Sequence, residues 1–271
     1  MPQSSVAFAT RIATVLCLAS FGAALAASRA YALDDGAEAQ QVFSFGGMCP
    51  NCELSGRKLA AARFIGGNFT GALLVGSDLK GASFVASNFV GADLARADLR
   101  GANMFGSIFM NANFTDANLA GVQGRGVNMV GAVLARANLE GASLPGAQFV
   151  RADAHDAQFT GAQLWAVNFA GAHLERTGFR NALLIAANLA GAVLTGADFS
   201  GANLAGANLT AADLSGAKGL TQMQVDQACG AANTRLPSGL TVKACKGDTN
   251  VIILQSPMAT KAGARRRIVS Y

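Results

Sequence analysis

The sequence is poor in charge and in histidine, and both shortages exclude classes of function. Only 14% of its 271 residues are charged, and 21 Lys and Arg nearly balance 16 Asp and Glu. This balance does not indicate the strongly basic or acidic surface of a nucleic-acid-binding protein. His155 and His173 are the only histidines, and neither has a nucleophile in an evident pocket, so no hydrolase triad is indicated. We therefore expect neither an enzyme nor a cofactor.

The N-terminal apolar run is short for a membrane span. It covers residues 12–27, about three to four fewer than the ~20 that cross a bilayer. Arg11 precedes it, and two Ala-x-Ala exits follow, ending at Ala26 and Ala32. This arrangement is typical of a secretory signal peptide, and we favour cleavage after Ala32. We expect the protein in the periplasm or outside the cell, with no membrane span in the mature chain. A retained anchor is the alternative.

Neither the 3.6-residue period of an amphipathic helix nor the two-residue alternation of a half-buried strand is present. The chain instead repeats every five residues, as in "GADFSGANLAGANLT" (196–210). Every fifth residue from Leu54 to Leu214 is Leu, Phe or Met, except Gly124 and Ala154, in a column of 33 positions without a slip. Two residues before each lies a second column, which is Ala at 23 of 33 positions. Two columns in phase over this length predict a solenoid.

The repeat resembles the motif A-(D/N)-L-x-x of the pentapeptide-repeat family. The match is residue by residue in "ADLARADLRGANM" (92–104) and "ANLAGANLTAADL" (202–214). The resemblance implies an all-β fold, a right-handed quadrilateral β-helix with twenty residues per coil and about eight coils. Both columns would point inwards, and the rod would be roughly 40 Å long at the spacing of hydrogen-bonded strands. Gly124 removes one core side chain, so we expect a local dent or bulge there. The stretch "GVQGRG" (121–126) around it is not expected to bind phosphate, because it lacks the following Lys and helix of a phosphate-binding loop.

The ends of such a solenoid need caps. Downstream, Thr221 and Gln224 have the spacing of a capping box, which predicts a short helix through about Cys229. The chain then divides into five expected regions: a signal peptide (1–32), an N-terminal segment and cap (33–51), the β-helix (52–217), a partly helical C-terminal cap (218–248) and a loose tail (249–271).

Four cysteines remain after the leader, and in an exported protein they suggest disulfides. Three pairings are possible, but the implied rod separates its ends far beyond the ~7 Å Cα limit of a disulfide. We therefore expect the local pairs Cys49–Cys52 and Cys229–Cys245, and no four-cysteine zinc site. A redox dithiol at Cys49 and Cys52 is the alternative, although the chain lacks the thioredoxin-like context for it.

Stacking at twenty residues brings polar side chains together. Asp153 would lie beside His173, and His155 beside Glu175, which makes these four a weak candidate for a metal or acid–base site. Another column alternates in sign over five coils and predicts a ladder of surface ion pairs that fixes register. Its members are Arg96, Asp116, Arg136, Asp156 and Arg176.

The residue after each core Leu or Phe should face outwards, and these residues differ between walls. One wall is largely apolar and includes Ile65, Val85, Phe105, Trp165 and Ile185. Exposed apolar surface of this kind marks an interaction site, although β-branched residues also favour extended backbone. We expect a non-enzymatic structural or interaction module of the cell envelope, which binds a protein, a second copy or its own termini through this corner.

The family resemblance also suggests an alternative. Some members protect type II topoisomerases by imitating DNA, which needs a cytoplasmic location and an acidic rod. Residues 53–218 contain 12 basic and 11 acidic side chains, and the leader indicates export, so we disfavour this function.

Overall fold

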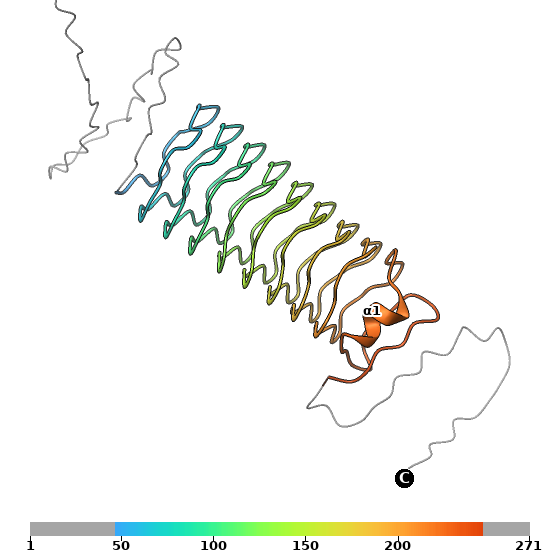
Figure 1. Cartoon of the computed structure of the whole chain (residues 1–271). Coiled ribbons are helices and arrows are strands. Elements are labelled where there is room, and N and C mark those ends of the chain that lie inside the picture. Colours follow the sequence, from blue (N-terminus) through green and yellow to red (C-terminus); the bar gives the residue numbers. More distant parts are fainter. Residues whose placement is uncertain (1–46, 246–271) are drawn as a thin grey trace, which may run out of the picture. The chain divides into compact units, whose positions relative to one another are not determined.

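The computed structural model describes residues 47–245 (Figure 1). The expected signal peptide, most of the N-terminal segment (33–46) and the residues from 246 onward, including the expected tail, lie outside the described residues. The described part is a stack of similar coils with one short helix at its C-terminal end, α1 (Gln222–Asp226). No helix among these residues has the length and apolar character needed to cross a bilayer.

Each coil is a square of four five-residue units, and adjacent coils pair in parallel with a register of twenty residues. Bridges join Met48 to Asn68 and continue in this register as far as Asp198 and Lys218. They form four columns, which define four faces of the β-helix in chain order. We name them the asparagine face (bridges from Met48 to Cys229), the histidine face (Glu53 to Arg235), the lysine face (Lys58 to Lys218) and the tryptophan face (Arg63 to Asn203).

The backbone hydrogen bonds explain the five-residue motif. Within a unit such as 92–96, the N–H groups of positions 2, 3 and 5 bond to carbonyls of neighbouring coils, as Asp93 does with Ala72 and Leu94 with Asn113. The N–H of position 1 donates to the carbonyl of the preceding core residue and so closes the turn. Only the position-4 N–H has no backbone partner in this pattern, and the side chain at position 2 accepts from it, as Asp93 Oδ1 does from Ala95 at 3.0 Å. Asn or Asp is therefore favoured at position 2 because it satisfies a donor that the coil geometry leaves over.

Positions 1 and 3 fill the interior. The Leu, Phe and Met side chains of the second and later coils are fully buried, with Ala between them. Phenylalanines one coil apart stack face to face, with centroid distances of 4.8 Å for Phe69 and Phe89 and 5.3 Å for Phe159 and Phe179. The small residue at position 1 thus leaves room for the large one at position 3.

Position 5 ends each turn in left-handed backbone. Glycine is the usual residue there, but the five charged residues of the expected ladder occupy it on the histidine face with φ between 57° and 59°. A side chain in this region costs free energy that glycine avoids.

The missing side chain at Gly124 does not break the register. Its N–H still donates to Ser143 O at 2.9 Å. A Cβ at Gly124 would lie 2.9 Å from a methyl carbon of Leu144, so neighbouring side chains have filled the interior. The structure therefore has no bulge here, and neighbouring core side chains occupy the space of the expected dent.

The C-terminal cap uses the predicted capping box. The Thr221 side chain accepts from the Gln224 N–H, and the Gln224 side chain accepts from the Thr221 N–H at 2.8 Å. Gln224 also donates to the carbonyls of Phe199 and Ala202, each at 2.8 Å, which satisfies backbone groups of the last coil.

The helix is shorter than the predicted one, which was expected to reach about Cys229. It ends at Asp226, because the chain must return to the β ladder. Cys229 pairs with Asn208 in a parallel bridge. The separation of these partners is one residue longer than the regular twenty, which accommodates the helical turn.

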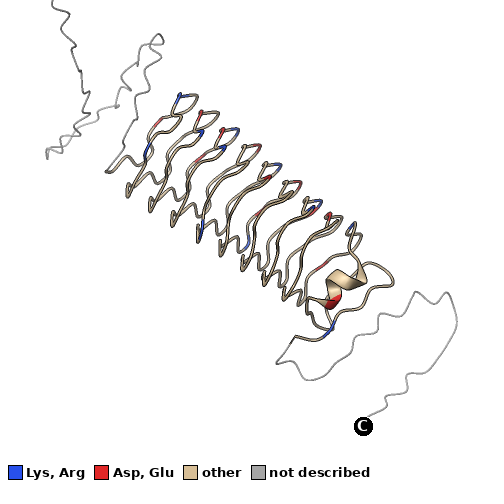
Figure 2. Cartoon of the chain, viewed as in Figure 1, with Lys and Arg blue, Asp and Glu red and all other residues tan. Residues whose placement is uncertain are grey.

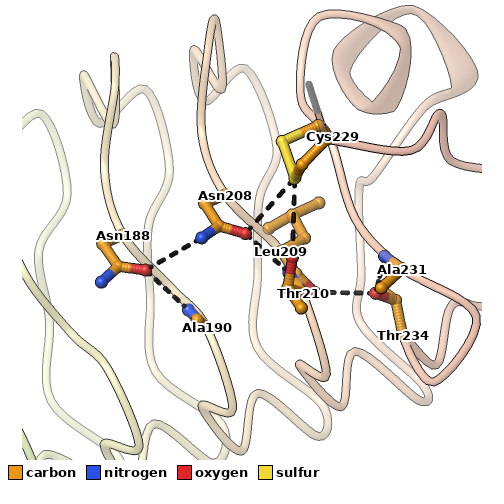
Figure 3. Close-up of a disulfide and its surroundings, with 9 residues drawn as sticks. Asn188, Ala190, Asn208, Leu209, Thr210, Cys229, Ala231 and Thr234 are labelled. Carbon is orange, nitrogen blue, oxygen red and sulfur yellow. Dashed lines mark hydrogen bonds between the residues drawn. A yellow bond between two sulfur atoms is a disulfide. The ribbon is translucent and has the colours of Figure 1, made fainter. Parts of the chain in front are cut away.

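The two expected disulfides are present. Cys49 and Cys52 have Cα atoms 5.5 Å apart, and Cys229 and Cys245 have Cα atoms 4.8 Å apart. The second bond lies beside Asn208 and Thr210, at the end of a column of hydrogen-bonded asparagines (Figure 3). It ties the last described residue to the cap.

Candidate functional site

The histidine face brings together the four residues of the proposed metal or acid–base cluster. Asp153 and His173 are bridged, and they line a surface hollow of about 330 Å³ together with His155, Glu175 and Arg176. His155 Nδ1 lies 2.6 Å from Asp153 Oδ1, and His173 Nδ1 lies 3.4 Å from Glu175 Oε1. The predicted neighbourhood of the four residues is therefore correct.

The geometry of this cluster does not match a metal or hydrolytic site. Each imidazole contacts the carboxylate of its own five-residue unit, so the structure forms two separate pairs. Among residues 47–245, no group of three or more His, Cys, Asp or Glu side chains is arranged to hold a metal ion. The hollow is lined by no Ser, Thr or Cys that could act as a nucleophile. One carboxylate oxygen, Glu175 Oε2, is enclosed without a hydrogen-bond partner.

The charged column on the same face resolves into two ion pairs. Arg136 binds both oxygens of Asp116, with both distances 2.7 Å, and Arg176 binds both oxygens of Asp156 at 2.7 and 2.6 Å. The guanidinium hydrogen bonds lower the pKa of each aspartate. A continuous ladder from Arg96 to Arg176 was expected. The structure differs because one guanidinium occupies both oxygens of its carboxylate, which leaves Arg96 without an ion pair among the described residues.

The tryptophan face carries the largest exposed apolar side chains of the β-helix. Phe105 is 52% exposed and Trp165 is 44% exposed, while Ile65 and Ile185 are 40% and 39% exposed. Val85, which was expected in the same row, is half-buried and therefore less exposed than these four residues. The apolar corner is thus present, with its two aromatic rings as the most prominent members.

A second hollow lies between these aromatics. Its volume is about 310 Å³, and it is lined by Asn103, Phe105, Gln123, Gly124, Arg125, Ser143, Pro145 and Trp165. The side chain of Pro145 is buried, so this position is recessed between the rings, and Gly124 contributes to the same lining. Sequence reasoning treated Gly124 and the apolar row as separate features, although they belong to one hollow.

Charge is distributed unequally around the coils. All eleven acidic residues of 53–218 lie on the histidine and lysine faces, which are adjacent. The asparagine and tryptophan faces together contain no acidic residue and only three basic ones, Arg63, Arg125 and Arg151. In Figure 2, many of the charged positions lie along the upper edge of the stacked coils and few lie along the lower edge. We call the asparagine and tryptophan faces together the acid-free half.

The cysteine pair at 49 and 52 lacks the setting of a redox dithiol. The helix α1 is the only helix among residues 47–245, and it lies in the C-terminal cap. A low-pKa thiol commonly needs a helix N-terminus or neighbouring cations. The disulfide closes the turn that leads into the first coil.

Comparisons with known proteins agree with the fold. The sequence profile described as pentapeptide repeats matches eight overlapping copies between residues 52 and 216. No curated protein sequence matches the chain.

Solved structures with similarity to this chain share the repeat. One is QnrB1, a plasmid-mediated fluoroquinolone resistance protein, with 20% identity, a TM-score of 0.43, and coverage of 69% of this chain and 93% of the other. Another is HetL from the cyanobacterium Nostoc sp. strain PCC 7120, with 29% identity, a TM-score of 0.30, and coverage of 60% and 83%. A third is a pentapeptide repeat protein from the Arabidopsis thaliana thylakoid lumen, with 30% identity, a TM-score of 0.26, and coverage of 45% and 68%.

Proposed function

Because this chain belongs to the pentapeptide-repeat family, whose members fold as right-handed quadrilateral β-helices, we propose that it is a non-enzymatic protein-interaction module of the bacterial-type cell envelope. The proposed docking surface is the tryptophan face. Members of the family are in general structural or interaction proteins, and the proposal gives this member a specific surface. Its location in the envelope rests on the expected signal peptide.

The hollow between Phe105 and Trp165 carries the proposal. Two exposed rings on either side of the recessed Pro145 offer both apolar area and shape. Aromatic residues and arginine are enriched at the centres of protein interfaces. Arg125 lies between the rings in the same row, so it can contribute a charged hydrogen bond to an acidic group of the partner.

The alternative functions have less support in the geometry. The two carboxylate–imidazole pairs of the histidine face do not converge on a metal or substrate position. DNA mimicry, suggested by the family resemblance and by no feature of this chain, needs an extended acidic surface. Here the acidic faces also carry arginines and lysines, and Arg100, Arg136, Arg176 and Arg180 pair directly with aspartates.

Affinity capture from an envelope extract tests the proposal. The parent chain is compared with Phe105→Glu/Trp165→Glu, and with Lys80→Glu/Arg180→Glu on the lysine face as a matched control. We expect a partner that the parent and the control retain and that the Phe105→Glu/Trp165→Glu variant loses. Circular dichroism and thermal melting establish that all three are folded. Equal capture by all three baits would contradict docking on the tryptophan face.

A further inference from the structure

Two rows of outward side chains run past the hollow of the tryptophan face. The ring row consists of Phe105, Arg125, Pro145 and Trp165. The amide row lies two residues earlier in the same units and consists of Asn103, Gln123, Ser143 and Gln163. Successive members of a row are one coil apart, about 4.8 Å, because the coils stack in a register of twenty residues. Both rows therefore run along the axis of the β-helix, across the coils.

The amide row offers hydrogen-bond donors, while part of its acceptors are in use. Asn103 Oδ1 accepts from the Phe105 N–H at 3.0 Å, and Gln163 Oε1 accepts from the Ser143 hydroxyl at 3.3 Å. Within residues 47–245, the side-chain amide groups of Asn103, Gln123 and Gln163 donate to no other residue, and all three side chains are exposed. An amide NH₂ has two donors, so this row suits an occupant that supplies acceptors.

The asparagine face shows that free amide donors are not a general property of the coils. There, neighbouring amides bond to each other along the stack. Asn188 Nδ2 donates to Asn168 Oδ1, and Asn168 Nδ2 donates to Gln148 Oε1, both at 3.1 Å. The exposed donors of the amide row thus distinguish the tryptophan face from its uncharged neighbour.

The arginines of the acid-free half add donors with positive charge. Among residues 47–245, neither an ion pair nor a side-chain hydrogen bond involves the guanidinium of Arg63, Arg125 or Arg151. On the other two faces, by contrast, five of the nine cations are paired with aspartates. These are Lys80, Arg100, Arg136, Arg176 and Arg180. Arg125 is exposed in the ring row, and guanidinium groups bind carboxylates strongly. An acidic occupant therefore complements this surface in charge.

The spacing of the ring row fits a chain in extended conformation. Three coil spacings separate Phe105 from Trp165, which is about 14 Å. In an extended segment every second side chain points to the same side, so the first and fifth residues lie about 13 Å apart. The third residue then lies over the recessed Pro145, within reach of Arg125.

We propose that the partner of the tryptophan face presents an extended acidic segment with the pattern apolar-x-(Asp/Glu)-x-apolar. Its two apolar side chains contact Phe105 and Trp165, and its carboxylate binds Arg125. The amide row donates to the backbone carbonyls of the segment. This inference rests on the proposed docking function and adds the chemistry of the partner. Because the attraction includes charges at the surface, salt weakens it.

A phage-displayed library of random peptides supplies a probe for this chemistry. The full-length parent, the Phe105→Glu/Trp165→Glu variant and Arg125→Gln serve as baits. Arg96→Gln is the matched control, since Arg96 is an exposed arginine of the histidine face that also forms no ion pair among the described residues. Circular dichroism and thermal melting establish that all four chains are folded.

We expect the parent and the control to enrich peptides that contain Asp or Glu with an apolar residue two positions to either side. The Phe105→Glu/Trp165→Glu variant should lose these peptides. A synthetic copy should bind Arg125→Gln about 10- to 100-fold more weakly than the parent by isothermal titration calorimetry, which is the range for a hydrogen bond between charged groups. Replacing its acidic residue by the amide should weaken binding to the parent by a similar factor, with little further loss in Arg125→Gln.

The outcomes separate this proposal from the docking function. If the peptides that depend on the two rings lack an excess of acidic residues, or if Arg125→Gln binds the acidic peptide as well as the parent does, the acidic segment is wrong and docking stands. If no peptide is enriched in dependence on the rings, the segment is also wrong, and the envelope capture alone decides the docking function. If acidic peptides are selected but no envelope protein is captured, the surface has the proposed chemistry and the docking function in the envelope is wrong.

Discussion

At the scale of single residues, the fold depends on one donor per unit that the coil cannot satisfy by backbone alone. The position-2 side chain accepts from that donor in unit after unit, as Asn128 Oδ1 does from the Val130 N–H at 3.1 Å. The motif's Asn or Asp is thus a backbone requirement rather than a sign of chemistry. The register of many aspartates and asparagines in the coils therefore follows from the backbone hydrogen bonding.

Replacement of Asn128 by alanine should therefore lower stability. The Val130 N–H loses its acceptor, at a cost of about 1 kcal/mol, whereas Asn128→Asp keeps an acceptor oxygen in the same place. Urea unfolding of the two variants and the parent measures the difference. Equal losses in both variants would show that the accepted hydrogen bond is not the cause.

Two alanines in one five-residue neighbourhood should respond oppositely to glycine. Ala166 has φ of 55°, so Ala166→Gly relieves left-handed strain and should stabilise by roughly 0.5–1 kcal/mol after the unfolded-state entropy of glycine is included. Ala162 is fully buried, so Ala162→Gly should destabilise by about 1–2 kcal/mol through lost burial and added backbone freedom. Denaturant unfolding of both variants checks the opposite signs, and a loss at Ala166 equal to that at Ala162 would refute the strain argument.

Asp198 should make stability depend on pH in the acid range. Hydrogen bonds from the Ser200 hydroxyl and N–H, and then from Arg180, lower the pKa of its carboxyl from 3.8 to about 2. A lowered folded-state pKa stabilises the protein above the ordinary value, and this stabilisation is lost as pH falls through about 2. The Tm difference between the parent and Asp198→Asn should stay constant above about pH 5 and shrink between about pH 4 and 2. A difference that is independent of pH over this range would contradict the assignment.

At the scale of elements, much of the coil could be predicted because its register is strict. Twenty-residue stacking correctly placed Asp153 beside His173 and Asp116 beside Arg136, since a column without slips fixes the neighbour of every residue. The pairing within the charged column could not be predicted in the same way. It depends on the direction in which each guanidinium turns, which side-chain rotamers decide after the backbone register is set.

The cap shows the same limit. The capping box at Thr221 fixed where α1 begins, because that signal is local. The end of the helix depends on Cys229 rejoining the ladder beside Asn208, a contact between segments that no local pattern encodes. The hollow at Gly124 and Pro145 likewise forms only when four coils are stacked.

The cap disulfide should stabilise the C-terminal end more than the other disulfide stabilises the first turn. Cys229 and Cys245 enclose a separation of 16 residues, against 3 for Cys49 and Cys52. The chain-entropy relation gives about 3 kcal/mol for the longer loop and about half of that for the shorter one. We expect Cys229→Ser/Cys245→Ser to expose the last coil to proteolysis sooner than Cys49→Ser/Cys52→Ser exposes the first. Limited proteolysis with mass spectrometry locates the cuts, and the same resistance in all three chains would contradict a role for the cap bond.

At the scale of the whole molecule, the β-helix separates its surfaces by chemistry. Two adjacent faces carry all the acidic residues of the coils, together with most of the basic ones. The other two carry exposed aromatic and aliphatic side chains, together with three arginines that form no ion pair within residues 47–245. A solenoid needs only its interior for stability, so the outward positions are free to differ from face to face. The asymmetry is therefore the feature most directly connected with function.

Photo-crosslinking in cells tests this account most directly. A photoreactive amino acid is placed at position 105 or 165 on the tryptophan face and, in matched chains, at position 80 or 140 on the lysine face. The account predicts a crosslink to one distinct protein from positions 105 and 165, and none to it from positions 80 and 140. Crosslinks that are the same from both faces, or that arise only from the lysine face, would contradict the claim that the tryptophan face is the surface through which this protein acts.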